Sequence, residues 1–299
     1  YLKANYPVEF MAAVLTSEKT DIERIALLID ECKRMEIEVL PPNINESLKN
    51  FTVVGKKDKI RFGLLAIKNV GENIIDSIAQ ERKENGKFKS IGDFLKRVNS
   101  KDLNKKSLES LIKAGAFDEF EERNKLLSNL EKLLEYSREY QKNKTNGQKG
   151  LFEAMNFSNN ITLEPSLTAT NFQKLSWEKE LLGLYVTSHP LEDFKQILEK
   201  RTLALAKIKD AFGRQRVRVG GIISGIEKII TKKGQPMLFV KLEDLTDRAE
   251  VIVFPSIIER NPSALQENKI VFISGRVDHR DNIPKIIAED IEEIITKEA

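Results

Sequence analysis

A short set of anchor-type residues lies near the middle of the chain, where Gln148, Leu151 and Phe152 form the pattern Q-x-x-L-F. The pattern follows a polar stretch at 141–147 that has no hydrophobic period and therefore predicts a loop. A glutamine with an aliphatic and an aromatic residue, exposed on a loop, suits a preformed apolar pocket with one polar contact beside it. The pattern alone is a weak signal, because a Leu-Phe pair more often belongs to a hydrophobic core.

Two segments of the chain each read as a helix, a tight glycine-containing turn and a second helix. The first turn contains Lys68, Asn69 and Gly71, and the second, a degenerate copy, contains Lys113 and Gly115. We expect Gly71 to take a positive φ and to let a phosphate approach the backbone. The N–H groups that open the next helix would then face the anion, a contact that reads the DNA backbone rather than its sequence. The alternative is that both glycines only close turns between helices, but two such turns in tandem favour DNA binding.

From Arg216 onwards the hydrophobic residues follow a period of two, which predicts strands. Five strands are expected, with a helical stretch at 255–265 between the third and the fourth, which is the order of an OB fold. OB folds bind single-stranded nucleic acid with strands two and three and with the loops that join strands 1–2 and 4–5. The residues at these places are Lys232, Lys233, Phe239, Lys241, Arg248 and Arg280. Phe239 has the alternative of facing the barrel interior.

Composition excludes several classes of site. The 299 residues are enough for two or three domains, and a net charge of +3 means that any basic surface must be local. The single cysteine, Cys32, permits no disulfide within the chain and fits a reducing cytoplasm. No apolar run reaches the length of a membrane span. With two histidines, no Walker loop and no two aspartates two positions apart, we expect no catalytic residue, metal or cofactor in this chain.

Five longer runs of residues, distributed along essentially the whole chain, carry a resemblance to a known family. They are residues 1–13, 37–45, 63–71, 147–152 and 177–190. Together they resemble the C-terminal half of the alpha subunits of bacterial DNA polymerase III, the DnaE-type replicative polymerases. The first two runs are similar to the end of that family's fingers domain and to the segment by which the chain leaves that domain. The third is similar to the first hairpin of its tandem helix-hairpin-helix. The last two are similar to the internal clamp-binding motif and to the segment that leads into the OB domain. The start of the chain, which lacks Met, predicts a piece of a longer polypeptide.

The resemblance implies a multidomain α plus β fold. Its expected parts are the helical end of a fingers domain at 1–50, a tandem helix-hairpin-helix DNA-binding region at 51–125, a helical clamp-binding region with a linker at 126–205, and a five-stranded OB-fold barrel at 206–299.

The resemblance also implies a function. Gln148, Leu151 and Phe152 would bind the β sliding clamp, the hairpins would bind duplex DNA, and the OB domain would bind the single-stranded template. Several weak contacts joined in one chain give processive synthesis. The catalytic palm, with its Mg²⁺-binding aspartates, would lie outside this chain, so the chain alone would not transfer nucleotides. Other subunits of the replicase would be further partners, in the cytoplasm.

Two other readings stay open at this point. A DNA ligase also combines OB and helix-hairpin-helix modules, although the OB domain comes first there and this chain has no lysine in a K-x-D-G nucleophile motif. A non-catalytic OB module that binds tRNA or single strands without any clamp is the third possibility. Loss of the Q-x-x-L-F motif would leave the function of such a module intact.

Overall fold

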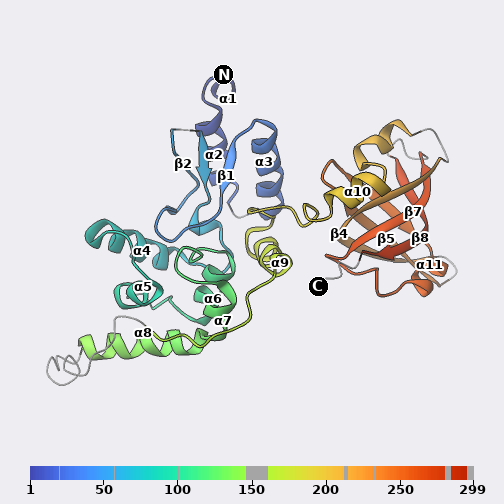
Figure 1. Cartoon of the computed structure of the whole chain (residues 1–299). Coiled ribbons are helices and arrows are strands. Elements are labelled where there is room, and N and C mark those ends of the chain that lie inside the picture. Colours follow the sequence, from blue (N-terminus) through green and yellow to red (C-terminus); the bar gives the residue numbers. More distant parts are fainter. Residues whose placement is uncertain are drawn as a thin grey trace. The chain divides into compact units, whose positions relative to one another are not determined.

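The computed structural model describes residues 1–19, 21–56, 58–99, 101–145, 161–211, 215–231, 234–279 and 284–294. The chain divides into two compact units, Tyr1–Thr187 and Ser188–Ala299 (Figure 1). Each unit encloses its own cluster of buried hydrophobic side chains.

The first unit begins with helices and a small sheet. The elements are α1 (Leu2–Asn5), α2 (Pro7–Ser17), α3 (Ile22–Arg34), β1 (Glu38–Leu40), β2 (Thr52–Val54) and β3 (Lys59–Arg61). Asp21 caps α3, because its side chain accepts a hydrogen bond from the Arg24 N–H at 3.0 Å. The sheet has the order β1-β3-β2, with β1 parallel and β2 antiparallel to β3. β2 and β3 form a short antiparallel pair, and β1 adds a third strand on the other side of β3.

A group of helices completes the first unit. It comprises η1 (Leu64–Ala66), α4 (Glu72–Asn85), α5 (Ile91–Arg97), α6 (Lys105–Lys113), α7 (Arg123–Ser128), α8 (Leu130–Thr145) and α9 (Asn171–Leu182). Phe88, Phe94 and Phe117 stack edge to face in the core, with ring centroids 5.2 Å and 4.9 Å apart. Capping boxes at Asn104 and Thr170 set the starts of α6 and α9.

The chain at 161–170 has no regular secondary structure, but polar side chains hold its backbone. The Asn129 amide donates to the Glu164 carbonyl at 3.0 Å and accepts from the Glu164 N–H at 3.0 Å. The Glu122 carboxylate accepts from the Ala169 N–H at 3.0 Å. These bonds fix the segment against α7 and the start of α8.

The second unit is a closed five-stranded barrel with short helices around it. Its elements are α10 (Lys195–Arg201), η2 (Leu205–Asp210), β4 (Arg216–Ile230), β5 (Pro236–Glu243), β6 (Arg248–Val253), α11 (Pro255–Arg260), β7 (Ile270–Asp278) and β8 (Lys285–Glu293). The strand order is β4-β5-β6-β8-β7, and the barrel closes through β4 and β7 (Figure 1). The expected OB-fold order, with a helix between the third and fourth strands, is confirmed.

Candidate nucleic-acid interface

The first hairpin turn joins η1 to α4, and its conformation differs from the expectation. The residue with a positive φ is Asn69, at 65°, whereas Gly71 has φ −81° and ψ 162°. The expectation that Gly71 takes a positive φ is therefore wrong. The chain instead reverses direction at Asn69, two residues before Gly71. Asparagine is one of the few non-glycine residues that tolerate the left-handed conformation. Gly71 instead occupies the N-cap position of α4 in an extended conformation.

Gly71 leaves open space at the start of α4. A Cβ atom built at this residue would meet no other atom within 4 Å. The neighbouring residues Lys68 and Asn69 are exposed as well. A helix leaves its first N–H groups without partners inside the helix, so the start of α4 can accept a phosphate that comes close to the backbone.

One acidic side chain at the start of α4 disfavours the binding of a phosphate there. Glu72, in the first turn of α4, forms an ion pair with Lys49. The hydrogen bond from the Lys49 ammonium, together with its charge, lowers the pKa of the Glu72 carboxyl. Glu72 therefore stays ionised, and Lys49, whose ammonium also lies 3.4 Å from the Asp76 carboxylate, offsets only part of the negative charge beside the turn.

The second turn has a different structure. Gly115 is buried with φ 83°. Its N–H donates to the Ile112 carbonyl at 2.9 Å and the Ala116 N–H donates to the Leu111 carbonyl at 3.0 Å, which is a Schellman ending for α6. A Cβ at Gly115 would lie 2.3 Å from Arg123 Nη2. This geometry favours the alternative in which Gly115 closes a turn between helices.

Lys113, next to this turn, is engaged within its own helix. Its ammonium lies 2.6 Å from the Glu109 carboxylate, one turn earlier in α6. Of the two turns, the first thus presents the more accessible backbone and lysine.

A buried ion pair joins α7 to α9, and it was not predicted from the sequence. Arg123 is 2% exposed and Glu178 is 0% exposed, and their side chains meet at 3.2 Å. Arg123 also binds Asp118 at 2.7 Å and donates to the Lys113 carbonyl at 3.0 Å. Burial by itself would lower the pKa of Arg123, but hydrogen bonds and the charges of Asp118 and Glu178 raise it. Both members of the pair stand in charged runs of sequence that are typical of solvated helix surfaces.

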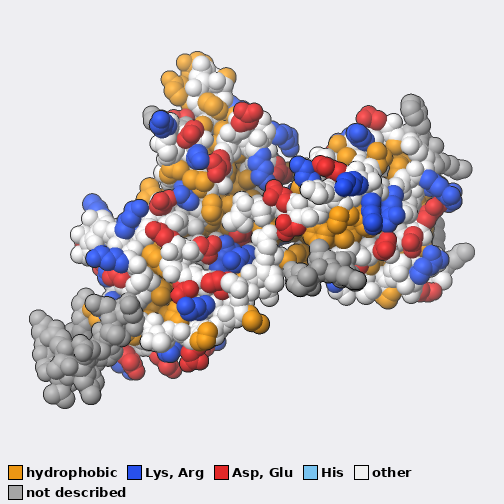
Figure 2. Space-filling model, viewed as in Figure 1, with side chains coloured by type: hydrophobic (Ala, Val, Ile, Leu, Met, Phe, Trp, Pro, Cys, Tyr) orange, Lys and Arg blue, Asp and Glu red, His pale blue; other side chains and the backbone are white. Residues whose placement is uncertain are grey.

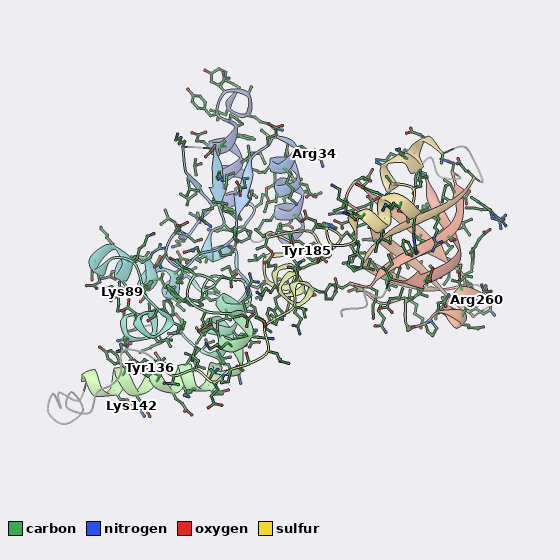
Figure 3. All side chains as sticks on the ribbon, viewed as in Figure 1. Arg34, Lys89, Tyr136, Lys142, Tyr185 and Arg260 are labelled. Carbon is green, nitrogen blue, oxygen red and sulfur yellow. The ribbon has the colours of Figure 1, made fainter. Side chains whose placement is uncertain are left out.

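Glu178 also holds the end of the first unit. Its carboxylate accepts hydrogen bonds from the N–H groups of Val186 and Thr187, each at 3.0 Å. Tyr185 follows α9 (Figure 3), and Lys179 Nζ lies 4.8 Å from the centroid of its ring.

The barrel carries a row of apolar side chains on its outer surface. Leu238, Val240 and Leu242 of β5 are buried in the barrel, so Phe239, which alternates with them and is half-buried, faces outward. Phe239 pairs with Ile252 of β6, and Ile252 pairs with Ile287 of β8. We call Phe239, Ile252 and Ile287 the outer apolar row.

Basic side chains border the outer apolar row. Lys285 Nζ lies 5.7 Å from the centroid of the Phe239 ring. Lys241 is exposed on β5, and Arg248 is exposed while it pairs with Glu243 at 3.1 Å. On the face drawn in Figure 2, basic and acidic side chains are interspersed over both units, in keeping with the small net charge.

Several predicted site residues fall in ranges that the structure does not describe. Gln148, Leu151 and Phe152 lie outside the described residues, as do Lys232, Lys233 and Arg280. On one side of the Q-x-x-L-F motif the chain is helical to Thr145, and on the other it is held at Glu164 by Asn129.

The described residues contain neither a membrane-spanning helix nor a cluster of metal ligands. None of their helices is long and apolar enough to cross a membrane. No group of three or more His, Cys, Asp or Glu side chains among them could hold a metal ion. Cys32 is fully buried, and burial raises the pKa of its thiol to about 11, which leaves the thiol protonated at neutral pH.

Comparison with known families assigns both modules. A family model described as "Helix-hairpin-helix motif" matches residues 36–127. A second, described as "OB-fold nucleic acid binding domain", matches residues 217–294.

Curated relatives match 97% of the chain. The chain is 37% identical to DNA polymerase III subunit alpha of Saccharopolyspora erythraea, covering 25% of that protein. It is 36% identical to the same subunit of Deinococcus radiodurans and of Thermus aquaticus, covering 22% and 24% of those proteins. Over nearly its whole length the chain is thus homologous to DNA polymerase III alpha subunits.

The chain spans about a quarter of the length of these alpha subunits. A helix-hairpin-helix followed by an OB fold fits a C-terminal region of a DNA polymerase III alpha subunit. The mixed α and β architecture expected from the resemblance is confirmed. The relatives named above are polymerase subunits and not DNA ligases.

Proposed function

We propose that this chain is the DNA-binding and clamp-tethering region of a bacterial replicative DNA polymerase. The observation that carries the proposal is the open turn before α4, where exposed Lys68 stands beside a glycine with free space around it. It lies within the part of the chain that matches the helix-hairpin-helix motif. Catalysis, with the expected Mg²⁺, would belong to a palm domain outside residues 1–299.

Duplex DNA would lie against this turn. A phosphate oxygen would accept hydrogen bonds from the N–H groups at the start of α4, which the helix dipole also favours. Lys68 would add a charge contact to the same strand. Neither interaction reads a base, so binding would be independent of sequence, as a polymerase that copies any template requires.

The single-stranded template would lie against the outer apolar row of the barrel. Bases would stack on Phe239, with Ile252 and Ile287 beside it. Lys241, Lys285 and Arg248 would attract the phosphates, joined by Lys232 and Lys233, which lie between β4 and β5 in the sequence, and by Arg280, which lies between β7 and β8. The outward direction of Phe239 and the cation over its ring support this role.

The Q-x-x-L-F motif would bind the β sliding clamp. Gln148 would supply the polar contact, and Leu151 and Phe152 would fill an apolar pocket. Together with the DNA contacts, this anchor would keep the polymerase on its template. The same role implies other replicase subunits as partners and the cytoplasm as location.

The proposal for the hairpin is tested by duplex binding. In Gly71→Ala the new methyl group occupies the space where a phosphate would approach, so we expect duplex affinity to fall about tenfold, equivalent to about 1.4 kcal/mol. Lys68→Ala should reduce the slope of log affinity against log salt by about 0.9. Fluorescence anisotropy with a labelled duplex measures both.

Lys83→Ala is the matched control, because Lys83 is an exposed lysine in the last turn of the same helix. It should bind duplex as the wild type does. Wild-type affinity of Gly71→Ala, with an unchanged salt slope in Lys68→Ala, would show that DNA does not contact this turn.

The clamp proposal is tested by calorimetry with a purified bacterial sliding clamp. Binding should disappear when Gln148, Leu151 and Phe152 are all replaced by Ala. A variant with Leu167→Ala and Phe172→Ala is the control, because these apolar residues are 88% and 44% exposed but lie outside the motif. Equal binding by the triple variant and the wild type would refute the tether.

A further inference from the structure

The turn that we assign to duplex DNA has little support of its own. Among the backbone hydrogen bonds of the described residues, the one that closes the turn joins the Val70 N–H to the Ile67 carbonyl at 3.3 Å, which is long. No side chain caps the start of α4, because its N-cap residue is Gly71. A turn of this kind holds one shape only if other parts of the protein hold it.

Two contacts from distant elements do so. The Lys68 N–H donates to the carbonyl of Leu181, near the end of α9, at 3.1 Å. The side-chain amide of Asn69 donates through Nδ2 to Ser110 Oγ at 3.2 Å. Both acceptors are distant from the turn in the sequence. The smaller separation, between Asn69 and Ser110, is 41 residues.

Ser110 offers a rigid reference point. It is 4% exposed and lies in α6, whose residues Leu108, Leu111 and Ile112 are fully buried in the core. The hydrogen bond from Asn69 therefore connects the first turn to the packed helix of the second helix–turn–helix unit.

The left-handed conformation of the turn does not by itself call for asparagine. Glycine adopts φ 65° with less strain than asparagine does. The side-chain amide is what asparagine adds at this position, and it is used for the bond to Ser110. A residue that only formed a tight turn, or only donated a hydrogen bond to DNA, would not need the Ser110 hydroxyl as an acceptor inside the protein.

We infer that Asn69 is a positioning residue and that Ser110 is its partner. Asn69 holds the turn against α6, so that Lys68 and the N–H groups at the start of α4 face one phosphate together. This inference rests on the proposed binding of duplex DNA by the turn. It assigns Asn69 an indirect role, in place of the direct DNA contact expected from the sequence.

A double-mutant cycle on the whole chain tests the inference. Asn69→Gly keeps the backbone conformation and removes the amide, and Ser110→Ala removes only the hydroxyl oxygen from a buried site. Each single variant should weaken duplex binding about threefold to tenfold, and the double variant should be no weaker than the weaker single one. The slope of log affinity against log salt should fall by no more than about 0.9, the loss expected when the Lys68 contact alone is removed.

Two further measurements separate positioning from general damage. Amide hydrogen exchange at Lys68 and Val70, whose N–H groups donate to the Leu181 and Ile67 carbonyls, should be faster in all three variants when it is recorded without DNA. Affinity for a single-stranded oligonucleotide, a property of the barrel unit, should not change. Asn85→Ala is the control, since Asn85 is an exposed asparagine at the far end of α4.

The outcomes are distinct. Additive losses in the double variant, or wild-type duplex affinity in both single variants, would overturn the positioning role while leaving duplex binding by the wild type intact. Failure of the wild-type chain to bind duplex at all would overturn the proposed function, and the positioning role with it.

Discussion

Gly71 and Gly115 look alike in the sequence, since each stands in a short turn shortly after a lysine. Their surroundings make them different. Gly71 has an ordinary negative φ and free space, whereas Gly115 has φ 83° and lies under the Arg123 guanidinium. The accessible glycine suits a ligand contact, and the buried glycine suits the ending of a helix.

Alanine substitution at the two glycines should therefore lower the free energy of unfolding to different extents. Gly115→Ala should lower the free energy of unfolding of the first unit by at least about 2 kcal/mol, because of the left-handed backbone and the overlap with Arg123. Gly71→Ala should lower it by less than about 1 kcal/mol, the difference between glycine and alanine at an N-cap. Urea unfolding followed by the fluorescence of Trp177, the single tryptophan, measures both. Equal losses in the two variants would contradict this assignment.

At the scale of elements, the buried pair of Arg123 and Glu178 joins α7 to α9, and Glu178 also binds the backbone of Val186 and Thr187. Removal of one charge leaves the other buried with fewer partners. Glu178→Gln should therefore destabilise the first unit by about 3 kcal/mol in the same urea experiment.

Asp118→Asn is the comparison, because Asp118 binds the same guanidinium but its side chain is 48% exposed. Its loss should cost about 1 kcal/mol or less, since water screens an exposed pair. If Asp118→Asn were the more harmful change, the buried carboxylate would not be the main partner of Arg123.

The elements differ in how far the sequence predicts them. The barrel strands follow from a period of two, and the helix between β6 and β7 follows from the break in that period. β1 was missed because it has three residues and pairs in parallel with β3, a contact that no local pattern records. The positive φ was expected at the glycine, but Asn69 takes it, held by Ser110 and neighbouring contacts from remote helices. The Arg123–Glu178 pair was hidden because charged runs predict solvated surfaces, and only tertiary packing buries it.

At the scale of the whole molecule, two units with separate cores carry the two nucleic-acid-binding modules in one chain. In the proposed function, each module alone would make few contacts with DNA: one turn in the first unit, and one apolar row with a basic border in the second. Joining them makes the second contact intramolecular once the first has formed, so that binding strengthens without any new interface.

DNA that contains both a duplex and a single-stranded overhang should therefore bind the intact chain at least about tenfold more tightly than a duplex or a single strand alone. Gly71→Ala and Phe239→Ala should each remove most of this gain, because each weakens one of the two contacts. In each variant, affinity for the DNA that binds only the other unit should stay at the wild-type value. Anisotropy titrations of the three DNAs at one salt concentration make the comparison. If the junction bound no better than the better of its parts, the two interfaces would not engage one DNA molecule at the same time, and processivity would rest on the clamp contact alone.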